Sequence, residues 1–147
     1  MNRFRRVSIL ALSLCTYSLA GALAASIALD DFAEANKSEM EKQFPFVTSV
    51  FPNGRFLISG FSAPSGDWRV IRVEGTEYCE NSICPTIVYH SKTEWKIFVK
   101  AERKIEASFT VTHGESVEIF LNVNQGDRLV VNYSNGEKVI GFFPKQQ

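Results

Sequence analysis

The sequence has few of the residues that usually build catalytic and metal centres. Among 147 residues there are three cysteines and two histidines, His90 and His113. No serine or cysteine lies in a nucleophile motif, and no spacing of histidine, cysteine and carboxylate residues resembles a zinc or calcium site. The sequence therefore predicts no metal and no cofactor, and it favours a protein that is not an enzyme.

The sequence also lacks an excess of charge of either sign. It contains 16 Lys and Arg against 16 Asp and Glu, and the two kinds are interleaved, as in segment 100–106. Such a surface lacks the basic patch that binds a phosphate backbone. We therefore expect no nucleic-acid partner.

Charge is missing altogether from residues 7–24, which are the most informative part of the chain. Arginines at positions 3, 5 and 6 precede this stretch, and it ends in Ala22-Leu23-Ala24. A basic start, an apolar run and a small-x-small ending are typical of a secretory signal peptide over residues 1–24. We predict cleavage between Ala24 and Ala25, which leaves a periplasmic or secreted domain of 123 residues with net charge −3.

An uncleaved membrane anchor is the alternative, because 18 residues without a charge reach the lower limit of a membrane span. Five Ser, Thr and Tyr residues lower the hydropathy of the stretch and favour cleavage. After cleavage we expect no stable membrane insertion. A lipoprotein is not expected, since Leu14 precedes Cys15 where lipidation signals have a small residue.

Two cysteines, Cys79 and Cys84, remain after cleavage, and in an oxidising compartment we expect them to form a disulfide. A redox-active pair is the alternative. Catalytic dithiols usually have two intervening residues and a stabilised thiolate, whereas the carboxylates of Glu77 and Glu80 disfavour a thiolate here. A structural bridge is therefore favoured.

The remainder, residues 25–147, reads as a single mostly β domain. Turn residues recur roughly every eight to twelve positions between β-branched and aromatic runs, as in an antiparallel sandwich or barrel. We expect about nine strands. One short amphipathic helix is predicted over about 30–43, with Pro45 ending it.

The last four strands are predicted in register as a meander. Apolar and polar residues alternate over 105–111 and 117–123, so one face of each strand belongs to the core. Three-residue loops at 112–114 and 124–126, with Gly114 left-handed, and a type I′ turn at Asn135-Gly136 keep that face continuous. A second layer must cover this face. The predicted partners are Phe109 and Val117, Ala107 and Ile119, Ile119 and Val131, Leu121 and Leu129, Val131 and Ile140, and Leu129 and Phe142.

The earlier strands are less regular. We predict a hairpin around Asn53-Gly54 that joins 46–51 to 55–62, a loop at 63–66, and strands over 68–78, 86–91 and 95–101. The disulfide would then lie at the end of a hairpin between neighbouring antiparallel strands.

Several polar residues are weighed as sites. His113 is expected at a hairpin tip, as a polar turn residue, and His90 near a strand end, where an ordinary structural role is favoured over acid–base catalysis. The acids Glu74, Glu77 and Glu80 could form a negative patch, but solvated strand and turn positions are favoured.

An apolar patch is predicted on the outer side of the last strands. Phe120 shares its strand face with Ser116, Glu118 and Asn122, and the register places three more apolar residues on that side. Either a second buried layer or a partner would cover it, and the buried layer is the simpler reading. The four candidate contact residues are Phe120, Val130, Val139 and Phe143.

The leading hypothesis is a non-enzymatic interaction module that binds a protein or an envelope polymer. The alternatives are a thiol oxidoreductase using Cys79 and Cys84, a small hydrolase using His90, and a small-ligand carrier. The carrier needs a cavity between the β layers, and the 12 phenylalanines argue for a filled core instead.

Overall fold

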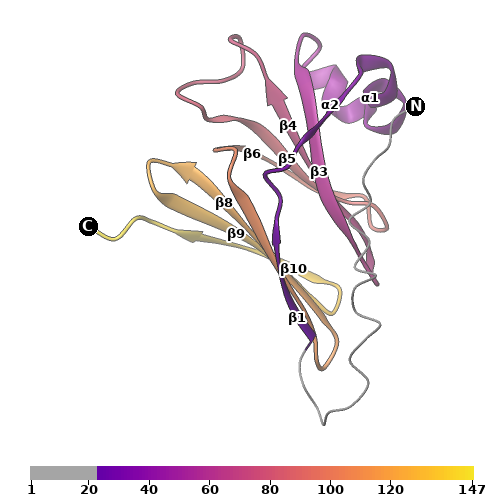
Figure 1. Cartoon of the computed structure of the whole chain (residues 1–147), viewed down its shortest axis with the longest axis vertical. Coiled ribbons are helices and arrows are strands. Elements are labelled where there is room, and N and C mark those ends of the chain that lie inside the picture. The colour runs from indigo at the N-terminus through magenta and orange to yellow at the C-terminus, as the bar shows by residue number, and fades with distance from the viewer. Residues whose placement is uncertain (1–22) are drawn as a thin grey trace.

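Residues 23–147, the part of the chain that the computed structural model describes, form two five-stranded antiparallel sheets packed face to face (Figure 1). The predicted mostly β antiparallel sandwich is confirmed. Sheet A contains, in spatial order, β1 (Leu23–Ala28), β7 (Ile105–Val111), β8 (Glu115–Asn124), β9 (Asp127–Ser134) and β10 (Glu137–Phe143). Sheet B contains β2 (Ala33–Ala35), β3 (Arg55–Ala63), β4 (Gly66–Glu74), β5 (Cys84–His90) and β6 (Trp95–Ala101).

The core between the sheets is filled by the inward residues of both. Trp68, Val70 and Val88 of sheet B meet Ile119 and Val131 of sheet A, and all five side chains are buried. The strict alternation of β7 and β8 arises because only one face of sheet A contacts sheet B.

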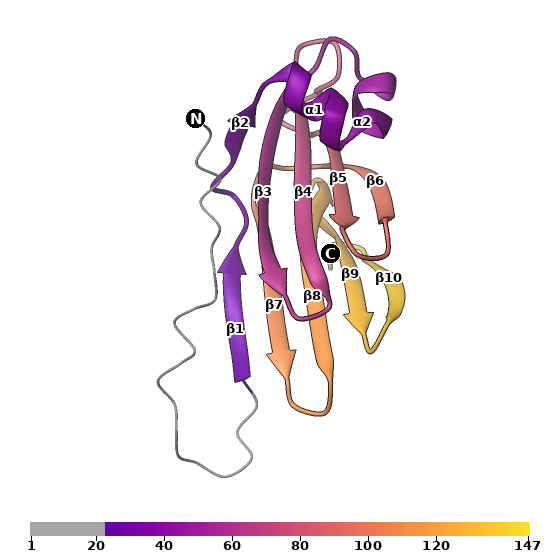
Figure 2. The ribbon, with the colours of Figure 1, turned by 90° about the vertical axis from the view of Figure 1, so that its right-hand side faces the viewer.

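Two short helices, α1 (Lys37–Gln43) and α2 (Pro45–Val50), cover the other face of sheet B at one end of the molecule (Figure 2). Met40 and Val47 of the helices pack in a second core with Phe56, Ile71 and Ile87 of the sheet. The part of sheet B beneath the helices is therefore buried on both faces, whereas no described element covers the outer face of sheet A.

The predicted registers of the C-terminal meander are confirmed, including Phe109 with Val117, Ile119 with Val131 and Leu129 with Phe142. At Asn135-Gly136 both residues have positive φ, 49° and 89°, as a type I′ turn requires. Local turn chemistry and side-chain parity are sufficient to fix this part of the sheet.

The predicted three-residue loop at 124–126 is wrong. Asn124 pairs directly with Asp127, so the turn has two residues, Gln125 and Gly126, both with positive φ. The register then shifts between Asn122 and Asn124, where Val123 forms a β-bulge. The bulge takes up the extra residue that we assigned to the loop, which is why the pairs beyond it are as predicted.

We expected the second layer to cover all four strands of the meander, but it does not reach the last one. Ile140 and Phe142 are on the face of β10 that points toward sheet B, yet they are 46% and 59% exposed. Their partners Val131 and Leu129 on β9 are buried and half-buried. The cover of sheet A therefore ends at β9.

The predicted helix over 30–43 is wrong in its first half. Residues Ala33–Ala35 form β2, which pairs with β3, and the helix begins only after Asn36, whose side chain accepts a hydrogen bond from the amide of Glu39. Pro45 does not end the helical region, because it occupies the first turn of α2, where proline is favoured.

The predicted hairpin around Asn53-Gly54 is also wrong. Residues 46–51, with their β-branched composition, read as a strand, but 45–50 is α2, and the partners of β3 are β2 and β4. Burial of Val47 and Thr48 against sheet B overrides the local preference. The strand predicted over 68–78 ends earlier, at Glu74.

The predicted signal peptide lies almost entirely outside the described residues. Its predicted cleavage bond, Ala24–Ala25, falls within β1, which pairs with β7. In the region 23–147 no helix combines the length and hydropathy that a membrane span requires.

Candidate functional site

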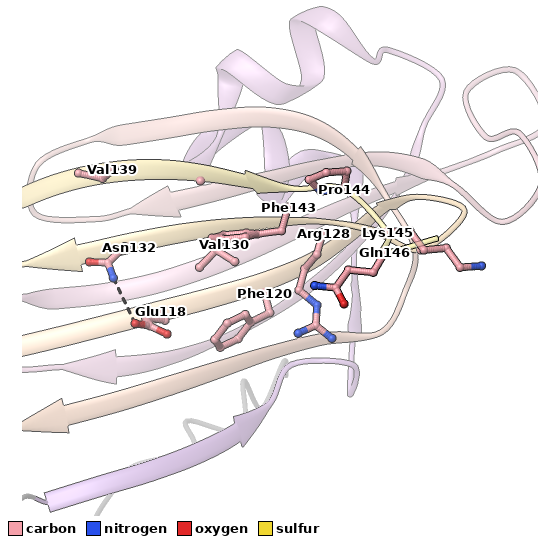
Figure 3. Close-up of a pocket in the computed structure, with 12 residues that line it drawn as sticks. Glu118, Phe120, Arg128, Val130, Asn132, Val139, Phe143, Pro144, Lys145 and Gln146 are labelled. Carbon is pink, nitrogen blue, oxygen red and sulfur yellow. Dashed lines mark hydrogen bonds between the residues drawn. The ribbon is translucent and has the colours of Figure 1, made fainter.

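The four residues predicted as a contact patch line one open groove on the outer face of sheet A. In cross-strand order Phe120 of β8 faces Val130 of β9, while Val139 and Phe143 come from β10. Figure 3 shows Phe120, Val130 and Phe143 beside one another. The groove has a volume of about 830 Å³. No element of residues 23–147 lies over it, so the buried layer that the sequence favoured here is not found in that part of the chain. Its lining comprises Glu118, Phe120, Gly126, Arg128, Val130, Asn132, Val139, Gly141, Phe143, Pro144, Lys145 and Gln146.

Gly141 creates the depression between Val139 and Phe143. It is the partner of Val130 across β9 and β10 and has no side chain to fill the row. A Cβ at this position would lie 2.9 Å from the ring of Phe143, so the ring lies along the strand over the glycine. The apolar floor is thus formed by Val130 and the Phe143 ring, and Val139 and Phe143 are 60% and 57% exposed.

The two ends of the groove differ in charge. At one end the guanidinium of Arg128 lies 5.9 Å from the centre of the Phe120 ring, and no carboxylate of the described residues forms an ion pair with it. Lys145 lines the same end. At the other end Glu118 accepts a hydrogen bond from Asn132 at 3.2 Å. An anionic group would therefore be attracted to the Arg128 end.

A second cluster surrounds His90, which is fully buried at the end of β5. Its ring lies 4.6 Å from that of Trp68 and stacks on Tyr133 at 5.4 Å. Nε2 is 3.3 Å from Ser65 Oγ, and Nδ1 is 2.9 Å from Thr93 Oγ1. His90 is therefore a core histidine with two hydroxyl partners.

The carboxylate of Glu115 completes this cluster from the opposite sheet. Ser65 donates its hydroxyl to Oε1 at 2.6 Å and its backbone amide to Oε2 at 2.8 Å. Because the serine proton is donated to Glu115, Ser65 Oγ accepts from Nε2–H, and Nδ1 accepts from Thr93. In a catalytic triad the histidine lies between serine and carboxylate. Here serine is in the middle, which is the order of a structural bridge.

Burial lowers the pKa of His90, and the ammonium groups of Lys138 and Lys92 lower it further, against the opposing charges of Glu115 and Asp67. The neutral imidazole is therefore the form that fits the hydrogen bonds of the cluster.

The Sγ atoms of Cys79, in the connection between β4 and β5, and Cys84, the first residue of β5, lie at disulfide-bonding distance. Cys84 is 3% exposed, and the buried guanidinium of Arg72 lies beside its sulfur at 3.1 Å. Arg72 also donates to the carbonyls of Ala101 and Ser82. The pair is thus packed against a buried cation, and one sulfur has little access to a partner thiol.

The three acids near the cysteines do not act together. Glu74 accepts from Arg72 and Arg55 and lies 3.6 Å from Arg103, so its charge is compensated. Glu77 and Glu80 are exposed, as is His113 in the β7–β8 turn. Glu77, Glu80 and His113 thus occupy solvated positions, as favoured, whereas Glu74 is half-buried and does not.

Sequence reasoning missed Ser65, Glu115, Arg128 and Gly141. Ser65 is 25 positions from His90 and 50 from Glu115. The pairing of β4 with β5 brings the first pair together, and the packing of the two sheets brings the second pair together. Gly141 could have been found from parity, since it falls in the apolar outer row between Val139 and Phe143. In the described region no three His, Cys, Asp or Glu residues are grouped to hold a metal ion.

Comparison of the chain with models of known protein families, with curated proteins and with solved structures finds no match.

Proposed function

We propose that this chain is an exported, non-enzymatic binding module whose groove on sheet A holds an anionic amphiphile of the cell envelope. The observation that carries the proposal is the combination of an apolar floor at Val130 and Phe143 with an unpaired guanidinium at Arg128. An alkyl chain would cover the floor, and its anionic head would lie at the Arg128 and Lys145 end.

An alkyl chain suits this surface better than a polypeptide segment does. The backbone groups of the central strands already pair within sheet A, so a peptide laid on its face would have no partners for its own amides and carbonyls. An alkyl chain has no such groups to satisfy. A partner protein remains the competing occupant that the experiment must separate.

Export is supported by the leader-like sequence of residues 1–24 and by the cysteine pair at bonding distance. A disulfide there is the state expected in an oxidising compartment. In the proposal the pair is a structural clamp on the β4–β5 connection. The burial of Cys84 supports this reading over a thiol oxidoreductase.

The test is calorimetric titration of the protein with dodecanoate, at concentrations below micelle formation, and with dodecyltrimethylammonium as the probe of opposite charge. We expect saturable binding that is stronger for dodecanoate. Arg128→Gln should weaken dodecanoate binding by roughly tenfold and remove the preference between the probes. Arg103→Gln is the matched control, because Arg103 also lies over a phenylalanine ring, that of Phe32 at 5.6 Å, away from the groove.

Val130→Asp should abolish binding of dodecanoate, since it places a carboxylate in the floor of the groove. Dodecanoate binding that is absent, or that is unaffected by Val130→Asp, would contradict the proposal. Peptides selected from a display library that bind through Val130 and Phe120, without dodecanoate binding, would assign the groove to a partner protein instead.

A hydrolase is the second candidate, and the 3.3 Å contact between Ser65 and His90 is the observation that favours it. The burial of the imidazole and the central position of the serine oppose it. A fluorophosphonate probe that labels the wild-type protein but not Ser65→Ala would establish this candidate. No labelling is expected.

A further inference from the structure

Among residues 23–147, the last strand, β10, is an edge of sheet A with no strand beyond it, and it has apolar side chains on both of its faces. Seven large hydrophobic residues are exposed in the described region, and four of them lie in β10. Val139 and Phe143 point to the outer face, whereas Ile140 and Phe142 point toward sheet B. A ligand in the groove would cover only the first pair, so the second pair needs a different explanation.

One of the two edge strands of sheet B, β6, shows how this protein protects an edge. Along β6 the exposed positions are Lys96, Phe98 and Lys100, and the lysines discourage pairing with another strand. Lys96 also lies 4.5 Å from the centre of the Phe46 ring, which covers part of this edge. β10 has charged residues only at its start, Glu137 and Lys138, and the five residues after them are uncharged. A long, apolar and unprotected edge is a site for adding a strand.

The backbone of β10 is arranged for such an addition. The two-residue turn closes on the pair Ser134 and Glu137, which therefore exchange hydrogen bonds with each other. Alternation then directs the amides and carbonyls of Lys138, Ile140 and Phe142 away from β9. Pro144 follows the strand and has no amide to offer, so the free edge has a defined length.

We propose that the occupant of this edge is β10 of a second copy, paired antiparallel about a two-fold axis through Gly141. Ile140 and Phe142 then face each other as a hydrogen-bonded pair, which agrees with their outward amides. Gly141 faces Gly141 of the second copy as a non-hydrogen-bonded pair. The axis joins the two copies of sheet A into one ten-stranded sheet.

The side chains are self-complementary in this register. Val139 faces Phe143 on the outer side, and Ile140 faces Phe142 on the inner side, so each exposed aromatic ring covers an aliphatic side chain. At both ends Glu137 faces Lys145, which gives two opposite-charge pairs across the axis. A shift of the register by two residues would place Lys138 opposite Phe142 and Val139 opposite Gly141. Both aromatic–aliphatic pairs would then be lost.

This dimer goes beyond the proposed function and does not depend on it. The two share Val139, Gly141, Phe143 and Lys145, since the axis would bring the two grooves together on one face of the joined sheet. Ile140 belongs to the edge and does not line the groove. It therefore separates the two proposals experimentally.

The test is sedimentation equilibrium of the protein expressed from its full-length chain, without added amphiphile. We expect a monomer–dimer equilibrium in the wild type. Ile140→Lys should raise the dissociation constant about a hundredfold, because it places a charge in the apolar interface twice per dimer. Phe98→Lys makes the matched change on the edge strand of sheet B, where Phe98 is 43% exposed, and should leave the equilibrium unchanged.

The register is tested by oxidation. In a non-hydrogen-bonded antiparallel pair the Cα atoms are about 4.5 Å apart, within the range of a disulfide. Gly141→Cys should give a covalent dimer on a non-reducing gel, and Ile140→Cys, which faces Phe142, should not. The exposed Phe143 ring can turn away from the new side chain. The wild type contains Cys15 as well, so it is the control for any cross-link that forms through that cysteine.

A protein that is monomeric at all concentrations, or a dimer that Ile140→Lys leaves intact, would overturn the proposal. Cross-linking through Ile140→Cys instead of Gly141→Cys would overturn the register. Dodecanoate binding by the Ile140→Lys variant would leave the proposed function standing even if the dimer fails.

Discussion

Ser65 Oγ lies 2.6 Å from Glu115 Oε1 and 3.3 Å from His90 Nε2, so one hydroxyl links the two sheets of the sandwich. Ser65 is in the turn between β3 and β4, and Glu115 begins β8. The hydrogen bonds run from Thr93 through the imidazole and the serine to the carboxylate. This end of the core depends on the proton arrangement of a buried histidine.

Stability should therefore fall as the pH is lowered below the ordinary pKa of histidine, about 6.5. Because burial and two lysines lower the pKa of folded His90, the unfolded chain binds its proton first. The contribution of His90 is complete above pH 6.5 and is lost as the pH falls toward the lowered pKa. Urea unfolding between pH 7.5 and 5.5 should show a slope of up to about 1.4 kcal/mol per pH unit, the limit for one proton.

The variant His90→Gln supplies the control for this pH dependence. It keeps a polar side chain in the cluster but cannot titrate, so its free energy of unfolding should change less over the same range. Four charged groups act on the imidazole, namely Lys138, Glu115, Lys92 and Asp67, and the His90→Gln variant leaves all four in place. An equal slope in both proteins would contradict the assignment to His90.

Glu74 should contribute more to stability than its exposed neighbours. It is the carboxylate partner of Arg72, whose side chain is 3% exposed, and it also approaches Arg55 and Arg103. Glu74→Gln leaves the buried guanidinium without its counter-charge and should cost about 2 kcal/mol. The same change at exposed Glu77 should stay within about 0.5 kcal/mol. Urea unfolding of the two variants measures the difference, and equal costs would contradict it.

The C-terminal meander could be predicted because its register depends on residues that are close together in the sequence. Alternation decides which side chains point inward, and the Asn-Gly turn leaves one register that keeps the alternation in phase. The outer patch followed from the same parity. It could be identified before the sheet partners were known, since Phe120 breaks an otherwise polar row.

The N-terminal half was less predictable because its structure depends on packing between distant segments. Residues 46–50 have strand-like composition but become α2 when Val47 is buried on sheet B. The sequence predicts that Pro45 ends a helix, whereas in the structure it lies in the first turn of α2. The Ser65–His90–Glu115 cluster had no sequence signal, since no motif connects its three positions.

The cysteine bridge should act as a local clamp. It closes a loop with a sequence separation of 5, and the chain-entropy model gives about 2 kcal/mol for so short a loop. The double variant Cys79→Ala and Cys84→Ala should lose about that free energy of unfolding and keep its sheet content. Circular dichroism and urea unfolding test this, with the reduced wild type as a second sample. Complete unfolding on reduction would show that the bridge is essential to the fold.

Cleavage at Ala24–Ala25 should remove the leader without dismantling the first strand. Ala25 to Ala28 keep their pairs with β7, from Phe109 to Glu106, and the amide of buried Leu29 donates to the carbonyl of Ile105 at 2.8 Å. We therefore predict that the processed protein begins at Ala25, as its intact mass would show. Ala24→Leu should block processing, because peptidases require a small residue there.

The exposed position of Ala24 means that leucine has room in the folded protein, so retention of the leader would report on processing alone. Ser26→Leu is the matched control, since Ser26 is also exposed in β1 but lies beyond the bond that is cut. It should be processed like the wild type. A wild-type protein that keeps residues 1–24 and sediments with membranes would instead establish the uncleaved anchor, because those residues would then hold the domain at the bilayer.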